Sequence, residues 1–508
     1  MSTTHAEPTE GENSAPAIST VAGTGVGGSE GGDGPAVSAQ LNFPYGIALD
    51  GSGALYFSDH GNHQVRKITA DGTISTIAGT GTAGYRGDNG PAASAQLNWP
   101  RDVAVEDTGT VYVVDASNHR IRKITPDGTI STVAGTGRAG FGGDGGPATS
   151  AQLNVPFGLA ASSTGALYIA EYNNHRVRRI TADGKISTVA GTGVAGSAGD
   201  GGPAVSAQLN RPQAVAVDDS GNLYIADSHN HRVRKVAADG TISTVAGTGT
   251  AGFDGDDGPA TSAQLNSPLG VTVSRDGTLY FSDHRNHRVR KVAADGTIST
   301  VAGTGTAGFD GDDGPATSAQ LNNPVGIALD GSGALHIADH VNHRIRRIAA
   351  ARVADLPASG TVVCWANVRS GLRMGVHRES TKDGAEVHQV LASPRGHQRW
   401  RLIAVGQDAG EVLYRIENVR SGKVLEVAGA RETAGSAVSQ RAYEGDDAYH
   451  QHWRLIPIGS ATGTPQVFEI ANRNSGLLLR VDTNARTPVE QHGSEGDRRG
   501  RQWQLLPS

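Results

Sequence analysis

The sequence predicts an all-β protein assembled from two kinds of internal repeat. The first repeat is 56 residues long, because V/I-A-G-T-G begins at Val21 and recurs at Ile77, Val133, Val189, Val245 and Val301. The second is marked by tryptophans about 50 residues apart, at Trp400, Trp453 and Trp503. Neither part contains a convincing helical period. The 71 glycines among 508 residues, about twice average usage, recur at fixed offsets and are therefore turn residues rather than a sign of disorder.

One 56-residue period predicts four short strands. In the first period these are residues 45–50, 54–59, 63–69 and 73–79, separated by the turn signals Gly-Ser-Gly, His-Gly-Asn and Asp-Gly. Four-stranded units repeated around an axis are blades of a β-propeller. The sixth period lacks its fourth strand, and residues 17–23 supply the missing one. We therefore predict a closed ring of six blades over residues 17–350.

The residues of each period resemble a known repeat. P-x-G-(I/V)-A-(V/L)-D, followed by (L/V)-Y-(I/F/V)-(A/S/V)-D-x-x-N-H-(R/Q)-(V/I)-R-(K/R), resembles the NHL repeat. The GTGTAG…GDGGPA…AQLN insertion is similar to the expanded repeat of bacterial NHL proteins and of the teneurin propeller. The resemblance implies a propeller that usually serves as a non-catalytic recognition platform. Some six-bladed relatives are lyases or lactonases and some NHL propellers bind RNA, so an enzyme with an axial metal and an RNA-binding protein are the alternatives.

A different repeat follows the predicted linker at residues 351–359. Gln398-x-Trp400 and Gln451-x-Trp453 recur as a third triplet that ends at Trp503, with Arg501 where Gln is expected. An Asn-x-x-Ser-Gly turn precedes each triplet, and three such units close a three-fold β structure. Residues 360–508 resemble the ricin-type β-trefoil. We expect these tryptophans to belong to the core.

Sugar binding in that family implies an acidic residue and an aromatic residue in each lobe. The acidic position corresponds to Gly375, Glu426 and Arg480, and the aromatic position to Val390, Arg441 and His492. The middle lobe alone keeps a carboxylate. We take Glu426, with Tyr443 and His450 near it in sequence, as the candidate carbohydrate-binding residues.

The predicted propeller varies most where its first strands begin. The residues on either side of the proline that opens each first strand differ in every blade, although their neighbours hardly change. First strands line the axis of a propeller, so these residues rim the channel. A binding site must break the symmetry of the ring, and no catalytic set is evident here. We predict a ligand-binding rim, the alternative being that the insertions merely cover it, with these members: Phe43, Tyr45, Trp99, Arg101, Phe157, Arg211 and Gln213.

Three further motifs raise the question of a cofactor. G-x-G-x-x-G at residues 79–84 lacks the helix that would bind a dinucleotide. The segment 254–258, copied at 310–314, has the oxygen density of a calcium loop without its later ligands, so we expect turn capping. His60, His284 and His340 could form a three-histidine zinc site, but we expect their turns to lie away from the axis. We expect no cofactor, with calcium or zinc as the alternatives.

Charge and the N-terminal segment set expectations for partners and location. Residues 1–351 hold 33 acidic and 24 basic residues, and an acidic propeller is a poor binder of nucleic acid. No apolar run approaches the ~18 residues of a membrane span. Residues 1–16, expected to be disordered, contain no signal-peptide pattern. We expect a cytoplasmic monomer that binds a glycan or a protein, with export by another route as the alternative.

Overall fold

The computed structural model describes residues 16–106, 108–274, 277–349, 359–367, 372–391, 398–408, 411–431, 436–445, 448–457, 467–475, 477–480, 489–492 and 503–507. Within these residues the chain consists of β-strands, turns and short 3-10 helices, without an α-helix, which confirms the all-β prediction. The chain divides into two compact units, residues 14–350 and residues 351–508. The predicted disordered segment, apart from Pro16, and the linker, apart from Ser359, lie outside the described residues.

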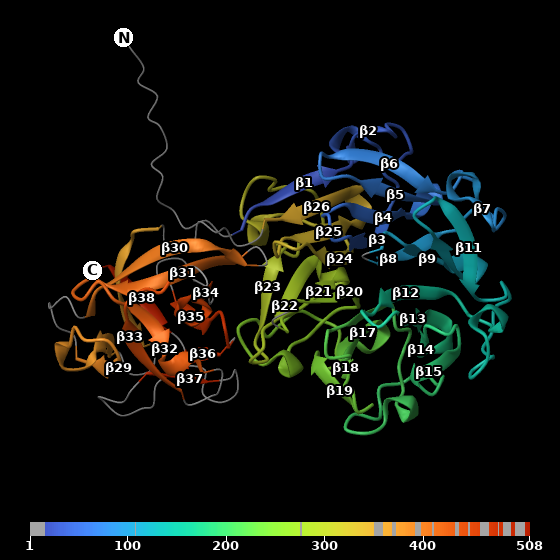
Figure 1. Cartoon of the computed structure of the whole chain (residues 1–508). Helices are drawn as coiled ribbons and strands as arrows, with labels where there is room; N and C mark the ends of the chain where they lie inside the picture. The colour runs from blue at the N-terminus through green and yellow to red at the C-terminus, as the bar shows by residue number, and fades with distance from the viewer. Residues whose placement is uncertain are drawn as a thin grey trace, which may run out of the picture. The chain divides into compact units, whose positions relative to one another are not determined.

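The first unit is the predicted six-bladed β-propeller (Figure 1). Each blade is an antiparallel sheet, and the first strands of neighbouring blades contact one another around the whole ring. Blades 1 to 3 are β3 (Pro44–Leu49), β4 (Leu55–Asp59), β5 (Gln64–Ile68), β6 (Thr73–Ala78); β8 (Pro100–Val105), β9 (Val111–Asp115), β10 (Arg120–Ile124), β11 (Thr129–Ala134); and β12 (Pro156–Ala161), β13 (Leu167–Glu171), β14 (Arg176–Ile180), β15 (Ile186–Ala190). Blades 4 to 6 are β16 (Ala214–Val217), β17 (Leu223–Asp227), β18 (Arg232–Val236), β19 (Ile242–Ala246); β20 (Pro268–Val273), β21 (Leu279–Asp283), β22 (Arg288–Val292), β23 (Ile298–Ala302); and β24 (Pro324–Leu329), β25 (Leu335–Asp339), β26 (Arg344–Ile348), β1 (Ile18–Ala22).

Blade 6 combines the two ends of the propeller sequence. β1 pairs antiparallel with β26, so that Ile18 lies opposite Ile348 and Ser19 lies opposite Arg347. The last blade therefore receives its fourth strand from the N-terminal side, as the repeat pattern predicts. No strand edge is left open between the last blade and the first.

The glycine-rich insertion that precedes each blade packs along the outermost strand of that blade. β2 (Gly34–Pro35) pairs with β6, and β7 (Gly90–Pro91) pairs with β11. A 3-10 turn then carries the chain back toward the axis. These turns are η1 (Ala36–Ser38), η3 (Ala92–Ser94), η5 (Ala148–Ser150), η7 (Ala204–Ser206), η9 (Ala260–Ser262) and η11 (Ala316–Ser318).

The apolar core of the propeller lies between adjacent blades. Between blades 1 and 2, for example, Tyr56 and Val65 pack with Val103 and Val113. Leu97 of the repeated Ala-Gln-Leu-Asn motif is fully buried in the same cluster. Burial of these aliphatic side chains, at roughly 1.5–3 kcal/mol each, holds each blade against the next.

A buried arginine on the third strand connects each of blades 2 to 6 to its insertion. In blade 2, Nη1 of Arg122 lies 3.2 Å from Oδ2 of Asp115, and Nη2 lies 2.8 Å from Oδ1 of Asp88 in the insertion. Thr132 on β11 donates a hydrogen bond to Oδ2 of Asp88 at 2.7 Å. Because both carboxylates contact the guanidinium, they offset the cost of burying its charge.

A histidine after the second strand links each blade to the next one. It follows a 3-10 turn in a left-handed conformation, with φ of 51–55° in the six blades. In blade 1, Nδ1 of His63 accepts a hydrogen bond from the backbone N–H of Trp99, just before β8, at 3.1 Å. His63 also caps its turn, since its backbone N–H donates to the carbonyl oxygen of His60 at 3.3 Å, so the histidine both ends the turn and contacts the next blade. The turns are η2 (His60–Asn62), η4 (Ala116–Asn118), η6 (Tyr172–Asn174), η8 (Ser228–Asn230), η10 (His284–Asn286) and η12 (His340–Asn342), and the linking residues are His63, His119, His175, His231, His287 and His343.

The second unit is a β-trefoil whose described strands form one twelve-stranded sheet. The tryptophans of the three repeated triplets are fully buried in its core, which confirms their expected structural role. The indole N–H groups of Trp400, Trp453 and Trp503 donate to the carbonyl oxygens of Met374, Leu425 and Leu479 at 3.0, 2.9 and 3.2 Å. The strands are β27 (Val362–Asn367), β28 (Arg373–Val376), β29 (Ala385–Val390), β30 (Trp400–Asp408), β31 (Glu411–Asn418), β32 (Val424–Val427), β33 (Ser436–Arg441), β34 (Trp453–Pro457), β35 (Val467–Asn472), β36 (Leu478–Arg480), β37 (Glu490–His492) and β38 (Trp503–Pro507), with the 3-10 turns η14 (His377–Glu379), η16 (Ala428–Ala430) and η17 (Tyr449–Gln451).

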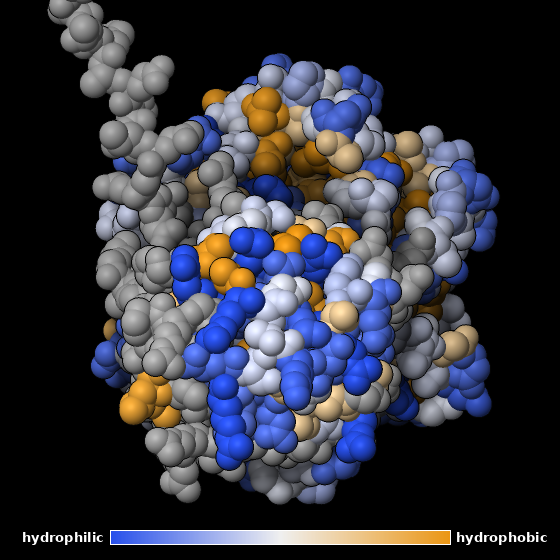
Figure 2. Space-filling model, turned by 60° about the vertical axis from the view of Figure 1, so that its left-hand side comes forward, coloured by the Kyte–Doolittle hydropathy of each residue, from blue (hydrophilic) through white to orange (hydrophobic). Residues whose placement is uncertain are grey.

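On the face shown in Figure 2, hydrophilic side chains cover most of the surface and hydrophobic ones lie in small groups between them. The described residues include no helix with the length and apolar character needed to cross a lipid bilayer. Exposed large hydrophobic side chains include Tyr85 and Trp99 of the propeller and Leu391 of the trefoil.

The histidine link predicts a pH dependence of stability. Burial lowers the pKa of His231 below its ordinary value, so the unfolded chain binds the proton more tightly. The stability that this link provides is complete above about pH 6.5 and is lost as the pH falls below that value. The amide of His231→Asn can accept the same hydrogen bond and tolerates the positive φ, but it does not titrate. We expect this variant to lose less stability than the wild type between about pH 7 and about pH 5.5, by under about 1 kcal/mol because the ring is half-exposed.

Urea unfolding at the two pH values measures this difference. His231→Ala, which removes the acceptor, is expected to be less stable than the wild type at both. An unchanged pH dependence in His231→Asn would show that the link does not depend on a neutral ring.

Candidate functional site

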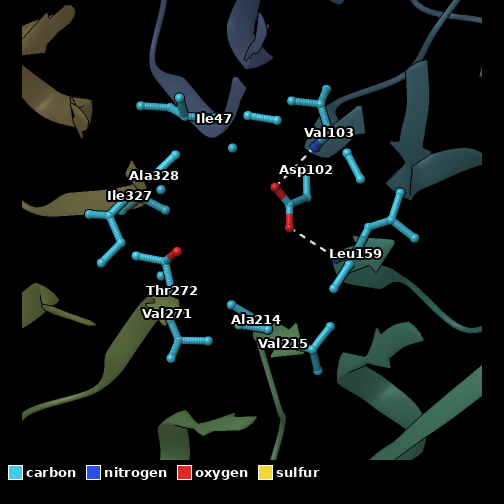
Figure 3. A pocket seen from close by; sticks show the side chains of 18 of the residues that line it. Ile47, Asp102, Val103, Leu159, Ala214, Val215, Val271, Thr272, Ile327 and Ala328 are labelled. Atoms are coloured by element: carbon cyan, nitrogen blue, oxygen red, sulfur yellow. Dashed lines mark hydrogen bonds between the residues drawn. The ribbon is translucent and has the colours of Figure 1, made fainter. Parts of the chain in front are cut away.

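The first strands of the six blades enclose an axial cavity of about 240 Å³ (Figure 3). Its wall is mainly aliphatic and includes Ile47, Val103 and Leu159. Asp102 on β8 is the one carboxylate among the residues that line this cavity, and none of them is a histidine or a cysteine. The side chains that line the cavity are therefore mostly aliphatic, with a single carboxyl group among them.

Asp102 joins blade 2 to blade 3. Its Oδ1 accepts the backbone N–H of Val103 and its Oδ2 accepts the N–H of Leu159 on β12, both at 2.9 Å (Figure 3). Burial raises the pKa of Asp102 to about 7, although the two N–H groups act in the opposite direction. A Cβ on Gly46 would lie 2.2 Å from Oδ1 and 2.5 Å from Cα of Asp102, so the close approach of blades 1 and 2 requires glycine there.

Sequence reasoning missed Asp102, although a signal was present. The equivalent positions in the other blades hold small residues, namely Gly46, Gly158, Ala214, Gly270 and Gly326. A carboxylate among five small residues breaks the repeat as clearly as the variable rim does.

Arginine and aromatic side chains from four blades meet at the mouth of the cavity. The guanidinium carbon of Arg101 lies 4.5 Å from the ring centre of Tyr45 and 4.0 Å from that of Phe157. The hydroxyl of Tyr45 donates to Oε1 of Gln213, in the opposite blade, at 3.2 Å. Tyr45 and Phe157 are buried, and burial raises the pKa of Tyr45. The structure thus brings these four predicted rim residues together across the axis.

The aromatic cluster continues into blades 3 and 4. Phe157 stacks on Tyr172 with ring centres 4.3 Å apart. Nη1 of Arg211 donates to the hydroxyl of Tyr172 at 3.3 Å, and Nε2 of His229 lies 3.3 Å from the same hydroxyl. Arg211 is exposed. Sequence reasoning missed Tyr172 and His229, which lie in second-to-third-strand turns that also vary from blade to blade.

Trp99 and Phe43 pack against histidines of the preceding blades. The ring centre of Trp99 lies 4.6 Å from that of His60, and Phe43 lies 5.1 Å from His340. Trp99 keeps 42 % of its surface exposed. The alternative that the insertions merely cover the rim is therefore wrong for Trp99, as it is for Arg211. We call Trp99, Arg101, Phe157, Tyr172 and Arg211 the mouth cluster.

The backbone at the rim is strained. The residue before each first-strand proline has a positive φ, including 51° at Trp99 and 49° at the β-branched Val155. Such a conformation costs of order 1–3 kcal/mol and persists where hydrogen bonds enforce it. At Trp99 the backbone N–H is held by His63, and the N–H of Asn98 is held by Asp115 at 2.8 Å. These two bonds therefore hold the backbone from which the variable rim side chain projects.

The three histidines that suggested zinc do not converge on one point among the described residues. Contrary to the expectation that their turns lie away from the axis, the rings of His60 and His340 both lie 5.5 Å from the ring of Tyr45. In His60, His284 and His340, however, Nδ1 contacts a backbone carbonyl of the next blade. Burial lowers the pKa of His60 to about 3 and that of His284 and His340 to about 4. Among the described residues no three His, Cys, Asp or Glu side chains converge on a common point that could hold a metal.

The other charged motifs contribute to the scaffold. In the calcium-like segment, Asp256 accepts hydrogen bonds from Arg290 and Thr300, both at 2.7 Å. In the Arg-Val-Arg-Lys stripe, Arg234 is fully buried and therefore cannot reach a phosphate. The charged groups of both motifs therefore make contacts within the propeller scaffold.

The trefoil candidates form two separate contacts. Glu426 is buried, and its Oε1 lies 3.2 Å from Nε of Arg441 while its Oε2 lies 3.7 Å from Nε2 of His450. Tyr443 contacts His452 instead, at 3.1 Å. Arg441, at the position where the lectin pattern has an aromatic residue, covers the carboxylate, so a sugar hydroxyl would have to displace it.

These features define the class of protein: a six-bladed NHL-type propeller joined to a ricin-type β-trefoil. The chain belongs to the SMP-30/gluconolactonase/LRE-like family, whose model matches residues 102–367. The model of the ricin-type beta-trefoil lectin domain-like family matches residues 352–441 and 396–492.

Curated relatives match the propeller. The chain is 30 % identical to Protein SUPPRESSOR OF QUENCHING 1, chloroplastic, of Arabidopsis thaliana over 61 % of this chain and 30 % of that protein. It is 30 % identical to Teneurin-4 of Homo sapiens, over 61 % of this chain and 12 % of that protein. It is 29 % identical to NHL repeat-containing protein 2 of Gallus gallus, over 61 % and 46 %. The chain thus spans less than half the length of each of these relatives.

A solved structure shows the same fold. A structural genomics protein of unknown function from Bacteroides thetaiotaomicron aligns with a TM-score of 0.50 and 22 % identity, over 66 % of this chain and 76 % of that one.

The raised pKa of Asp102 leads to a prediction for Asp102→Asn. The folded state holds the carboxyl proton more tightly than the unfolded state does, so the wild type loses stability as the pH rises from about 4 to about 7. The amide of Asn keeps the oxygen acceptor and stays neutral. We expect the stability of the variant relative to the wild type to increase over this range, by up to a few kcal/mol, and to level off above it.

Guanidinium unfolding across the pH range provides the measurement. Asp219→Asn, at an exposed turn position, is the control and should show no such increase. A constant difference between Asp102→Asn and the wild type would contradict the buried, protonatable state of Asp102.

Proposed function

We propose that this protein is a non-catalytic recognition protein whose mouth cluster binds a glycan through an acidic sugar residue. One observation carries this proposal. Arg101 and Arg211 are placed against aromatic rings where nearly identical blades diverge, and no carboxylate of the described residues forms an ion pair with either. Guanidinium groups recognise carboxylates in a planar geometry.

The exposed face of Trp99 complements the arginines. An aromatic ring offers a flat apolar surface on which a sugar ring can stack while its polar edge stays solvated. The neighbouring histidines add no positive charge at neutral pH, because burial lowers the pKa of His60 and of His340 far below 7. The charge of the mouth therefore comes mainly from arginine, which fits an anionic ligand despite the acidic composition of the propeller as a whole.

The enzyme alternative fits the axial cavity less well. A lyase or lactonase with an axial metal requires several converging ligands, whereas Asp102 is the only carboxylate among the residues that line the cavity. Its two oxygens already accept backbone hydrogen bonds. This donor set does not fit a metal.

Removing the exposed members of the mouth cluster tests the proposal. We expect Trp99→Ala and Arg211→Ala to lower affinity for uronate- or sialate-bearing glycans at least tenfold each, which corresponds to about 1.4 kcal/mol. A glycan array with the full chain, followed by calorimetric titration, supplies the measurement. Tyr85→Ala is the matched control, because Tyr85 is an exposed aromatic residue of the propeller that contacts Arg120 away from the rim.

Equal affinity in the wild type and in the two mouth variants would rule out this site. Binding of an acidic peptide but of no glycan would instead assign the mouth to a protein partner.

The trefoil is a second candidate for carbohydrate binding, supported by the position of Glu426 in the middle lobe. If a sugar displaces Arg441, its hydroxyls can donate to the Glu426 carboxylate, and His450 lies beside it. We expect Glu426→Gln to reduce glycan binding by the trefoil about tenfold, because a neutral amide accepts more weakly than a carboxylate.

Glu417→Gln is the control for this variant, since Glu417 forms a comparable ion pair, 3.0 Å from Arg401, elsewhere in the trefoil. The measurement uses Trp99→Ala/Arg211→Ala as the background, so that binding at the mouth does not contribute. No change on replacing Glu426 would exclude the middle lobe as the sugar site.

A further inference from the structure

Blade 1 lacks one member of the polar scaffold that the other blades share. In blades 2 to 6 an insertion aspartate lies 34 residues before the buried arginine and accepts a hydrogen bond from its Nη2 at 2.5–2.8 Å. A threonine of the fourth strand donates to the other carboxylate oxygen at 2.6–2.7 Å. The aspartates are Asp88, Asp144, Asp200, Asp256 and Asp312, and the equivalent position in blade 1 is Gly32.

Arg66 is nevertheless buried like its five counterparts. Its side chain is 1 % exposed, and Nη1 lies 3.3 Å from Oδ2 of Asp59. Nη2 donates to the insertion aspartate in the other five blades and Nε does so in four of them, but in Arg66 neither has a hydrogen-bond partner among the described residues. Thr76, the counterpart of the threonine donor, lies opposite Arg66 in the strand ladder, and no hydrogen bond joins its hydroxyl to a described residue.

Gly32, which stands at the position of the missing carboxylate, is exposed to solvent. A Cβ built on Gly32 would have Nη2 of Arg66 as its nearest neighbour, at 3.7 Å, which is an ordinary contact distance. The aspartates at this position in blades 2 to 6 keep 29–44 % of their side chains exposed. In blade 1 Gly32 is exposed, whereas Nε and Nη2 of Arg66 are shielded from solvent, so a ligand has to displace part of the insertion to reach them.

A buried guanidinium with two unused donors is unfavourable unless an acceptor is supplied. The other five blades show which acceptor the site accommodates: a carboxylate with one oxygen toward the arginine and the other toward the threonine. Blade 1 therefore has the donors for a carboxylate, without the residue that would supply it.

We propose that Arg66 and Thr76 form a carboxylate-binding site at the vacant position beside Gly32. Nε and Nη2 of Arg66 donate to one oxygen of the bound group, and the Thr76 hydroxyl donates to the other. The ligand is a small organic acid or the side chain of an aspartate or glutamate in a polypeptide, since both present the same group. This site is separate from the mouth cluster and does not depend on it.

Thermal unfolding of the full chain in chloride-free buffer at constant ionic strength tests the proposal. Sodium acetate is expected to raise the Tm of the wild type in a saturable way. Gly32→Asp is expected to have a Tm higher by at least about 2 °C without acetate and to lose the response to acetate, because its own carboxylate fills the site. Gly32→Ala, which adds a Cβ without the carboxylate, should keep the response.

Two further variants test the proposal even if Gly32→Asp proves to be unstable. Thr76→Val should weaken the apparent acetate affinity several-fold while Arg66 stays in place. Asp88→Gly recreates the vacancy in blade 2, and it should lower the Tm and add a second response to acetate.

A blocked peptide with one central aspartate distinguishes the two sources of the carboxylate. Tighter binding of the peptide than of acetate, lost in Gly32→Asp, assigns the site to a polypeptide, and the reverse order assigns it to a free organic acid. The proposal is overturned if neither probe raises the Tm of the wild type, or if Gly32→Asp and Gly32→Ala respond alike.

Discussion

The structure of the propeller depends on one buried arginine per blade. In blades 2 to 6 its guanidinium lies between the carboxylate that ends the second strand and the carboxylate of the insertion, as Arg122 does between Asp115 and Asp88. Without these partners the buried charge would destabilise the blade by several kcal/mol. In those five blades the insertion thus supplies an acceptor that the buried guanidinium requires, and this bond helps to hold the glycine-rich segment against the sheet.

This scaffold separates the residues that must be kept from those that are free to change. The histidine link and the strand-ending carboxylate fix the backbone on both sides of the rim, as His63 and Asp115 do at Trp99 and Asn98. The side chain at that point contributes little to the fixing, so tryptophan, valine, arginine or serine can occupy it. A symmetric ring can in this way carry an asymmetric surface without loss of its fold.

Periodic features were predictable from the sequence because turn chemistry is local. Asp71-Gly72 and its copies mark the strand ends, and the missing fourth strand of the last period led directly to residues 17–23. Contacts between blades were not predictable in this way. The turn at His60 folds over the neighbouring first strand, with Nδ1 2.9 Å from the carbonyl oxygen of Pro100, so it approaches the axis rather than leaving it.

In the candidate sites, too, local sequence features were predictable and contacts across the fold were not. The variable rim was visible in the sequence, because substitutions stand out against copied neighbours. The stacking of Arg101 between Tyr45 and Phe157 depends on distances across the ring that no repeat period encodes. Likewise, the pattern pointed to Glu426, but its covering by Arg441 requires the folded position of β33.

The pairing of β1 with β26 also has a consequence for the order of folding. β1 is synthesised before every blade, and its partner strand is the last of the propeller to emerge from the ribosome. Blades 1 to 5 can form successively from local contacts, whereas the closing pair must wait for the end of the array. Once it has formed, neither terminal blade can peel away without first breaking this long-range pair. Closure is therefore a late step of folding, and it protects the completed ring against unfolding from its ends.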